Sequence, residues 1–373
     1  MKILHIAESA RGGVGTYLAE ILPDQARRYG GGRVRALVPA QHAAHLSGVD
    51  RRLLATWRRP DRGMLAVLKL AGAIRREVAR FQPTIVHAHS SVAGGALRLL
   101  YGWSRPPFRI VYCPHGWALD RRSIAIKNDL IARIERSLAP AADRIVVISE
   151  HERRQGLNIG IADERMALVL NGIADLPPAR PARWDDPRTR ILFVGRLDEQ
   201  KGFDTLLDAV EPIQDRVSVR VIGKAVAGPA TQSRPRRSKV DYLGWRSLAE
   251  VSTEIAAADV VVVPSRWEGF GLVALEAMRG GCAVVASAVG GLREIVVDGV
   301  TGRLVPPDSP AQLMDVLVAH DRDAWGKMGR AGRARYEALF TATRMNDQLD
   351  ALYRELSPVV VDAPVEPVRA VHA

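Results

Sequence analysis

The stretch "DVVVVPSRWEGFGLVALEAM" (residues 259–278) carries the clearest structural signal in the chain. Its four consecutive valines are typical of a strand that a parallel sheet covers on both faces. Gly269 and Gly271 then permit a tight turn, and apolar residues at three- and four-residue intervals predict a helix beginning near Leu272. A buried strand, a turn and a helix in succession form the repeating unit of an α/β fold.

The same alternation extends over both halves of the chain. In the first half, strands are predicted at residues 2–8, 33–39, 84–90, 109–115, 144–150 and 166–172. In the second half, strands are predicted at residues 190–196, 217–223, 240–245, 259–265 and 283–288. Helical periodicity lies between them, and Pro23 is expected to kink or restart the first helix. The predicted fold class is α/β, with two Rossmann-like, doubly wound parallel-sheet domains.

The length of 373 residues suits two domains, and a proline-crowded segment at 174–188 is the predicted linker between them. This linker separates residues 1–173 from residues 189–342. The helical pattern at 343–356 is expected to return to the first domain and to act as a hinge with the linker. Residues 357–373 are expected to form a disordered tail. Because ligands of open α/β sheets bind beyond the carboxyl ends of the strands, we expect the site in a cleft between the domains.

Cysteine usage and hydropathy favour a cytoplasmic protein. Cys113 and Cys282 have no neighbouring Cys or His at zinc-binding spacing. At the start of the chain, His5 and Glu8 interrupt a short apolar run and no small-residue cleavage site follows, so we predict a strand there and not an export signal. No run of about 18 apolar residues predicts a membrane-spanning helix. Attachment to the inner face of a membrane stays compatible with these observations.

The excess positive charge lies entirely in the first half of the chain. Residues 1–175 hold 27 Lys+Arg against 15 Asp+Glu, whereas the rest of the chain holds 26 of each. Arginines mix with apolar residues at 50–62, 73–81 and 120–138. Such clusters suit a surface that faces anionic lipid or a phosphorylated acceptor, or else the solvated faces of an arginine-rich protein. The basic, proline-containing segment at 224–239 is expected to be a mobile surface loop.

A glycine-rich turn follows the first predicted strand. Gly12, Gly13 and Gly15 lead into a helix, where free backbone amides favour an anion such as a diphosphate. The spacing is not G-x-G-x-x-G and no P-loop lysine follows, which weakens dinucleotide oxidoreduction and ATP hydrolysis. Taken alone, the motif could equally be an ordinary turn between a strand and a helix.

Two cations follow the first strand of the second half. Arg196 comes directly after this strand, and Lys201 lies five residues later at a helix start. Two cations at a helix N-terminus would neutralise a departing diphosphate. The alternative is a charged turn in which these cations pair with Asp198 and Glu199.

Two glutamates flank the turn in the opening stretch. Glu268 precedes the predicted helix, and Glu276 lies about one turn inside it. The two carboxylates could therefore hold different parts of one elongated ligand. Nothing in the spacing indicates the carboxyl pair about 5 Å apart that a retaining hydrolase needs.

These motifs, taken in order, resemble a known family. The Gly-Gly loop, the His-Gly pair in "CPHGW", Arg-x4-Lys, Glu-x7-Glu and "GGLREIVVDGVTGRLV" are similar to the retaining family 4 glycosyltransferases of the GT-B fold. The resemblance covers most of residues 1–356, and its second-domain portion is highly specific. It implies two Rossmann-like domains that face each other across a cleft.

The resemblance also implies roles for residues that bind a nucleotide-sugar donor. Glu276 would hold the ribose hydroxyls, and Glu268 would reach hydroxyls of the transferred sugar. Arg196 and Lys201 would stabilise the departing nucleoside diphosphate. The remaining donor contacts would come from Gly12 and Gly13 in the first domain and from the amides of Phe270, Gly271 and Leu272 in the second.

Histidines are the other chemical feature of the first domain. His115 matches a family histidine near the donor sugar and the reacting centre, although a lone histidine at a strand end is more often structural. His87 and His89 lie two residues apart and so share one face of a strand. For these two we favour a structural or acceptor-side role over metal binding.

The predicted activity is a retaining, metal-independent hexosyl transfer from a nucleotide sugar, UDP being favoured over GDP. The acceptor is expected to be a lipid-linked or cell-surface polysaccharide precursor at the inner membrane face. No cofactor or metal is expected, because no Asp-x-Asp follows a strand to hold Mg²⁺ with a diphosphate. A soluble acceptor, a sugar-nucleotide epimerase and a non-catalytic basic membrane-surface binding protein are the alternatives. Nucleic acid is not expected as a partner, since aromatic residues do not interleave with the basic ones.

Overall fold

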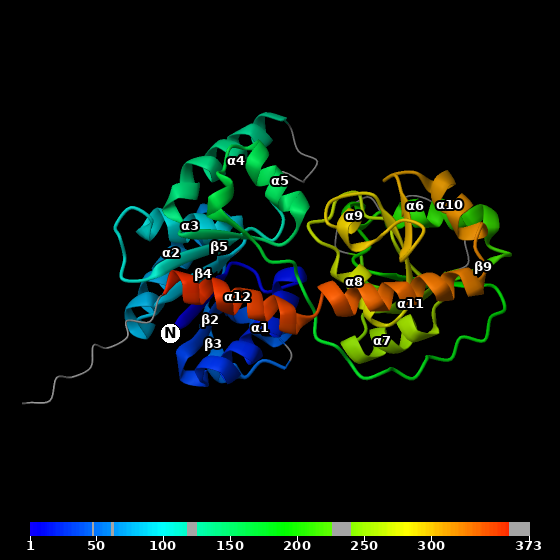
Figure 1. Cartoon of the computed structure of the whole chain (residues 1–373), viewed down its shortest axis with the longest axis horizontal. Helices are drawn as coiled ribbons and strands as arrows, with labels where there is room; N and C mark the ends of the chain where they lie inside the picture. Colours follow the sequence, from blue (N-terminus) through cyan, green and yellow to red (C-terminus); the bar gives the residue numbers. More distant parts are fainter. Residues whose placement is uncertain (47, 61–62, 118–124, 226–239, 358–373) are drawn as a thin grey trace, which may run out of the picture.

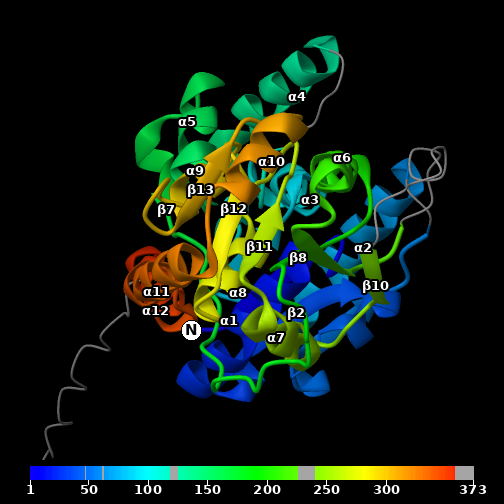
Figure 2. The same cartoon turned by 90° about the vertical axis from the view of Figure 1, so that its right-hand side faces the viewer.

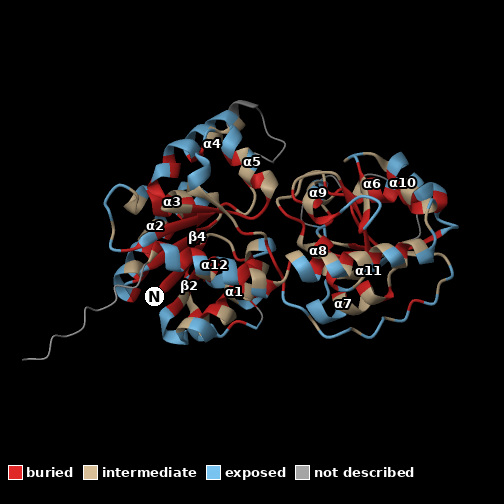
Figure 3. Ribbon diagram, in the orientation of Figure 1, coloured by how far each residue is buried: buried red, intermediate tan, exposed pale blue. Residues whose placement is uncertain are grey.

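The computed structural model describes residues 1–46, 48–60, 63–117, 125–225 and 240–357. The chain forms two domains that lie side by side, each with a parallel sheet between helices (Figure 1). The sheets are buried and the helices expose their outer faces (Figure 3). Apart from their first residues, the predicted loop at 224–239 and the predicted tail at 357–373 lie outside the described residues.

The first sheet has seven parallel strands in the order β3-β2-β1-β4-β5-β6-β7. Its strands are β1 (Ile3–Ala7), β2 (Val34–Pro39), β3 (Leu54–Trp57), β4 (Ile85–His89), β5 (Arg109–Cys113), β6 (Arg144–Val147) and β7 (Met166–Leu168). Its helices are α1 (Gly13–Tyr29), α2 (Met64–Phe81), α3 (Ser91–Tyr101), α4 (Ala125–Leu138) and α5 (Glu150–Asn158). Helix α1 runs on through Pro23 and does not restart there, although the proline removes one backbone donor from the helix.

The second sheet has six parallel strands in the order β10-β9-β8-β11-β12-β13. Its strands are β8 (Thr189–Val194), β9 (Val217–Ile222), β10 (Val240–Gly244), β11 (Val260–Val263), β12 (Ala283–Ser287) and β13 (Gly302–Val305). Its helices are α6 (Phe203–Val210), α7 (Leu248–Ala257), α8 (Leu272–Arg279), α9 (Leu292–Ile295), α10 (Pro310–Val318) and α11 (Arg322–Leu339). The doubly wound parallel architecture predicted from the sequence is confirmed.

The last helix, α12 (Ala342–Leu356), crosses back to the first domain. It lies nearly in line with α11, so that the two overlap when the molecule is turned (Figures 1 and 2). Arg28 at the end of α1 donates to Asp347 of α12 over 2.6 Å, and Tyr29 donates to Asp350. Helix α12 is therefore packed against the layer of helices that covers the first sheet.

Part of the basic cluster at residues 50–62 lies in the first sheet and not on a lipid-facing surface. The segment 50–62 contains strand β3, which pairs with β2, and the side chains of Leu53 and Trp57 are buried. These apolar residues therefore face the core and not a lipid surface. Arginines flank the strand at positions 51, 52, 58 and 59, and they hid it because they leave only a short apolar run between them.

Candidate active site

Loops from the two domains meet between the sheets. His115 and Gly116 follow β5, and Gly269 follows β11. A methyl group on Gly269 would lie 3.2 Å from Cα of Gly116 and 3.5 Å from the carbonyl oxygen of His115. A methyl group on Gly13, the first residue of α1, would lie 3.8 Å from Cδ1 of Leu272, the first residue of α8. The structure thus brings the predicted glycine turn, the His-Gly pair and the Glu-x7-Glu segment together.

Glycines hold the loop that carries Glu268. Gly271 has φ 113° and precedes α8, which begins at Leu272 as predicted. Gly290, in the segment before α9, has φ 48°, and a methyl group there would lie 1.7 Å from the carbonyl oxygen of Glu268. A side chain at position 290 would therefore collide with the loop, so the glycine fixes where Glu268 can lie.

The predicted amide donors lie at residues 270–272. The side chain of Phe270 is buried, with its ring 6.1 Å from that of Phe340, so any contact of this residue with a ligand would have to come from its backbone. The first amides of a helix have no partner within the helix. The start of α8 can therefore offer backbone donors to an anion beside Glu268.

Lys201 and Glu268 form an ion pair in this loop region. The Lys201 Nζ atom lies 2.5 Å from Oε2 of Glu268, and the hydroxyl of Ser265 donates to the same oxygen over 3.2 Å. The carboxylate of Asp198 accepts from the backbone amide of Lys201 over 3.1 Å, which orders the turn. One cation and one carboxylate are thus held together where the two domains meet.

Arg196 lies on the same turn but is more exposed. Its guanidinium lies 3.0 Å from the carboxylate of Asp198 and donates to Gln200 over 2.6 Å, with 44% of its side chain accessible. The ion pair that the alternative interpretation expects is therefore present between Arg196 and Asp198. That interpretation does not describe Lys201, whose partner is Glu268.

Glu276 lies in the second turn of α8 and is half-buried. Burial raises the pKa of its carboxyl to about 7, against the lowering effect of the Arg279 guanidinium. Glu20, on α1 of the other domain, raises this pKa further because its charge is of the same sign. The carboxyl group therefore titrates near neutral pH, and a hydroxyl ligand would find it readily available as an acceptor when ionised.

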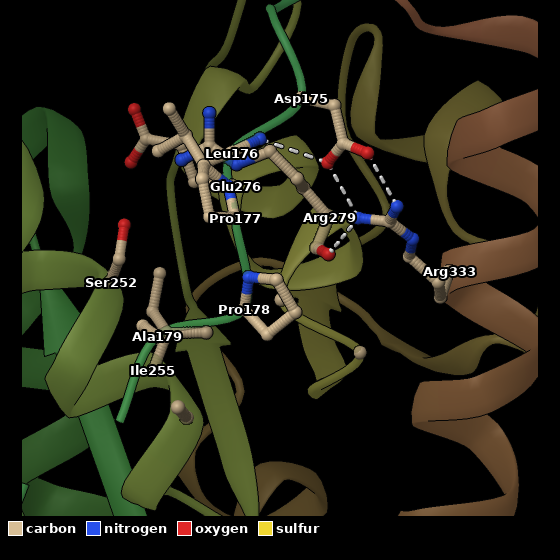
Figure 4. Close-up of a pocket in the computed structure, with 13 residues that line it drawn as sticks. Asp175, Leu176, Pro177, Pro178, Ala179, Ser252, Ile255, Glu276, Arg279 and Arg333 are labelled. Atoms are coloured by element: carbon tan, nitrogen blue, oxygen red, sulfur yellow. Dashed lines mark hydrogen bonds and ion pairs between the residues drawn. The ribbon is translucent and has the colours of Figure 1, made fainter. Parts of the chain in front are cut away.

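A cavity of about 630 Å³ opens beside Glu276. The linker forms one wall, and Figure 4 shows Asp175 in this wall facing Arg333 of α11. Arg333 binds Asp175 through two bonds of 2.7 and 2.6 Å, and Arg279 donates to the carbonyl of Ala174 over 2.9 Å. The linker is therefore fastened to the second domain at the point where the cavity begins.

His115 occupies an unusual backbone conformation. Its φ of 54° lies in the left-handed region that side chains other than glycine seldom adopt, and Gly116 follows with φ 98°. The buried carboxylate of Glu152 accepts from the amides of Gly116 and Ile148, and Trp117 donates to the carbonyl of Glu152 over 2.9 Å. Residues outside the predicted site thus hold the His115 loop in a conformation that is costly by itself.

The side chain of His115 ends a row of histidines. Its Nε2 lies 2.9 Å from Nδ1 of His89, whose Nε2 lies 3.0 Å from Nδ1 of His5. Burial lowers the pKa of His115 to about 3 and that of His5 to about 4, and it places the pKa of His89 well below the ordinary range. Ring nitrogens of His5, His87 and His89 also lie within 4.8 Å of one another, close enough to hold a metal ion. The preference for a structural or acceptor-side role therefore stays a prediction.

Several residues around the site were missed from the sequence. These are Gln25, Glu152 and Arg266, together with Gly290, which lies in the quoted GGLREIVVDGVTGRLV motif but had no predicted role. Arg266 binds the carboxylate of Asp204 over 2.7 Å and also pairs with Asp308, which secures the start of the Glu268 loop. For Gln25, the available signal was its partner His5, a polar residue inside the otherwise apolar strand β1.

Comparisons with known proteins agree with this geometry. Residues 11–175 match the family described as "Glycosyltransferase Family 4", and residues 188–320 match "Glycosyl transferases group 1". The chain is 26% identical over 366 residues to an uncharacterized 41.2 kDa protein in the cps region of Klebsiella pneumoniae, covering 95% of this chain and 99% of that protein. It is 34% identical over 321 residues to the D-inositol 3-phosphate glycosyltransferase of Geodermatophilus obscurus, covering 75% and 69% of the two chains.

A solved structure has the same fold. HepE of Anabaena, in complex with UDP-glucose, superposes with a TM-score of 0.79 over 95% of this chain and 100% of its own, at 21% identity. The family matches span both domains, and the curated relative exceeds 30% identity over most of its length. The chain therefore belongs to the family 4 glycosyltransferases, as its sequence motifs predicted, and it has the GT-B fold expected of them.

Proposed function

We propose that this chain transfers a hexosyl unit, with retention of configuration, from a nucleotide sugar to a lipid-linked or cell-surface polysaccharide precursor. The observation that carries the proposal is the contact between the loop of His115 and Gly116 and the loop of Glu268 and Gly269. A donor bound there would have a charged pair on one side and a neutral histidine on the other. The match to a protein of a Klebsiella cps region supports an acceptor of the cell envelope.

The donor's diphosphate would lie against the turn of the second domain. Arg196 and Lys201 supply the positive charge, and the amides at the start of α8 supply hydrogen bonds to phosphate oxygens. Gly12 and Gly13 leave the first domain's backbone free to approach from the opposite side. HepE, which shares the fold, binds UDP-glucose, and UDP is accordingly the favoured nucleotide here.

The two glutamates would hold the two ends of the donor. Glu268 lies beside Lys201 and would accept hydrogen bonds from hydroxyls of the transferred sugar. Glu276 lies farther along α8, beside the cavity, and would accept from the ribose hydroxyls. The two carboxylates would then hold different parts of one elongated ligand.

The transfer itself requires three coordinated changes. The bond between the anomeric carbon and the diphosphate oxygen breaks, and the acceptor oxygen bonds to the same face of that carbon. The proton of the acceptor hydroxyl passes to the departing diphosphate. Lys201 and Arg196 stabilise the charge that develops on the diphosphate, so we propose that the reaction needs no metal ion.

The acceptor would approach over the first domain. The first turns of α2 expose Met64, Leu65 and Leu68, and the arginines at 75 and 76 are also exposed. Their spacing places these residues on one side of the helix, as suits contact with an anionic bilayer. No helix among the described residues is long and apolar enough to cross a membrane.

A thermal-shift titration with UDP, GDP, dTDP and ADP, each with and without EDTA, tests the donor assignment. We expect UDP to raise the melting temperature most, in proportion to its affinity and concentration, whether or not EDTA is present. Absence of stabilisation by all four nucleotides would contradict the proposal and favour a non-catalytic binding protein. Stabilisation that EDTA abolishes would contradict metal-free transfer.

A transfer assay then separates the enzyme classes. With UDP-sugar and membrane extract, the proposal expects release of UDP that depends on the acceptor lipid. An altered nucleotide sugar without any acceptor would indicate an epimerase instead. Flotation with phosphatidylglycerol vesicles tests the membrane contact: Leu65→Asp with Leu68→Asp should weaken binding, and Leu99→Asp on α3, also exposed, serves as the control.

A further inference from the structure

The row of histidines behind His115 continues to a fixed end. His5 Nε2 lies 2.7 Å from Oε1 of Gln25, a residue of α1 that is 3% exposed. The chain of hydrogen bonds therefore runs from His115 through His89 and His5 to Gln25. Every link is buried except the half-buried ring of His115, so solvent cannot substitute for a missing partner.

The end of the row determines the direction of every hydrogen bond in it. A neutral imidazole has one donor nitrogen and one acceptor nitrogen, and a carboxamide oxygen can only accept. The Nε2 of His5 must therefore donate to Gln25, which leaves Nδ1 of His5 to accept from Nε2 of His89. By the same reasoning, Nδ1 of His89 accepts from Nε2 of His115. All three rings then carry their proton on Nε2.

The Gln25 amide also reaches helix α12. Gln25 also makes a side-chain hydrogen bond with Tyr353. Because the Gln25 oxygen already accepts from His5, its NH₂ group donates to the Tyr353 hydroxyl. That hydroxyl donates in turn to Nδ1 of His87 over 2.6 Å. A reversed amide would reverse every hydrogen bond from Tyr353 to His115 and place the proton of His115 on Nδ1, so the orientation of the Gln25 amide sets the tautomer of all three rings.

We propose that Gln25 is a positioning residue for the transfer reaction: through His5 and His89 it keeps the proton of His115 on Nε2 and leaves Nδ1 as an acceptor. This inference rests on the proposed function, in which His115 meets the donor sugar. An acceptor nitrogen would receive a hydrogen bond from a hydroxyl group of that sugar. If the proton were on Nδ1, this nitrogen would itself be a donor. A sugar hydroxyl that donates to it would then lose its acceptor.

A bound metal ion is the competing use of the same rings. Nitrogens of His5, His87 and His89 lie within 4.8 Å of one another, and Nε2 of His87 has no hydrogen-bond partner among the described residues. However, Nδ1 of His5 and Nε2 of His89 are only 3.0 Å apart, a distance that a shared proton explains. A metal would take the lone pairs that the hydrogen-bonded row needs.

The test is histidine NMR on the ligand-free, full-length protein labelled with ¹⁵N-histidine. Long-range ¹H–¹⁵N correlations distinguish the two tautomers, and the His115→Gln variant assigns the signals of His115. We expect Nε2–H for His115, His89 and His5 in the unmodified protein. In Gln25→Met the row loses its acceptor, and we expect His115 to become a mixture of tautomers.

Two further variants separate this role from simple packing. Tyr353→Phe keeps the ring but frees the Gln25 amide, and it should also give a mixed tautomer at His115. Asn346→Ala removes another buried amide at the contact of α1 and α12, whose partner is the Glu20 carbonyl, and should leave the tautomers unchanged. Gln25→Met should lower kcat/KM for the donor about three- to tenfold, the value of roughly one hydrogen bond.

The outcomes are distinct. His115 with its proton on Nδ1, or a tautomer that Gln25→Met does not change, would overturn the proposal. One equivalent of zinc or another metal in the purified protein, measured by plasma mass spectrometry, would also overturn it. Unchanged donor kinetics in a Gln25→Met protein with altered tautomers would overturn the link to catalysis. Because the spectra need no substrate, they decide the proton's position even if the transfer activity proposed above is absent.

Discussion

On the second-domain side of the cleft, Lys201 and Glu268 form an ion pair, whereas on the first-domain side the groups behind His115 are neutral and buried. The charged side lies on a short turn that keeps partial access to solvent, and the neutral side lies within the sheet. This difference suits a ligand with a charged diphosphate at one end and a sugar at the other. It also predicts that substitutions on the two sides reduce activity to different extents.

The largest effect is expected from Lys201→Ala. This change removes a cation from the diphosphate site and leaves Glu268 without its ionic partner, so we expect kcat/KM to fall about 100- to 1,000-fold. Steady-state transfer kinetics measure it, with Lys327→Ala on an exposed face of α11 as the control. Equal activity of the two variants would place the diphosphate elsewhere, and it would contradict the assignment of the second-domain side as the charged side of the site.

Gly290→Ala tests the glycine that supports the charged side. The added methyl group would meet the Glu268 carbonyl at 1.7 Å in a backbone conformation that alanine adopts poorly. We expect the free energy of unfolding to fall by about 2–4 kcal/mol, together with most of the activity. Urea denaturation followed by the transfer assay measures both.

The matched control is Gly299→Ala. Gly299 also has a positive φ, 74°, but no atom lies within 4 Å of an added methyl group. This variant should lose only about 1 kcal/mol and keep its activity. If Gly290→Ala lost no more stability and activity than Gly299→Ala, the packing of Gly290 on the Glu268 loop would not matter for function.

The pH dependence of nucleotide binding tests Glu276. Its pKa is raised from 4.5 to about 7, so the carboxylate takes up a proton as the pH falls through neutrality. If the ionised form accepts the ribose hydroxyls, affinity for UDP should rise about tenfold between pH 6 and pH 8. Calorimetry at the two pH values measures this rise, and Glu276→Gln should abolish it.

The same shift affects stability in the opposite direction. The folded protein holds this proton more tightly than the unfolded chain does, so the contribution of Glu276 is lost as the pH rises from about 4.5 to 7. The Glu276→Gln protein should therefore gain stability relative to the unmodified protein at pH 8. A gain at pH 5 of the same size would contradict the assigned pKa.

The smallest effect is expected where the two sides touch outside the site. Glu294 of α9 accepts from the backbone amides of Glu150 and His151, at the start of α5 in the other domain, over 2.8 and 2.6 Å. Glu294→Ala removes this contact, and we expect a modest increase in the radius of gyration by X-ray scattering. Addition of UDP should reduce the increase, since the donor binds both domains. An unchanged scattering curve would show that this contact does not hold the domains together.

Local patterns predicted the fold and several of the loops that the structure brings together at the candidate site. Buried valine runs identified the strands, and the spacing of Lys201, Glu268 and Glu276 was informative because each follows a strand or begins a helix. The partners of these residues were not predictable, because they depend on contacts between distant segments. His87 and Tyr353 are 266 positions apart, and no local pattern in the sequence marks Gln25 as a neighbour of the site.

The course of α12 has a consequence for how the protein is made. A ribosome releases the first domain's strands early, but the helix that packs on α1 and supplies Tyr353 is synthesised only after the whole second domain. Part of the first domain's surface therefore stays uncovered until α12 has been synthesised. During synthesis the second domain can mature as a unit before the first. The surface between α1 and α12 would therefore form only after the second domain has been synthesised.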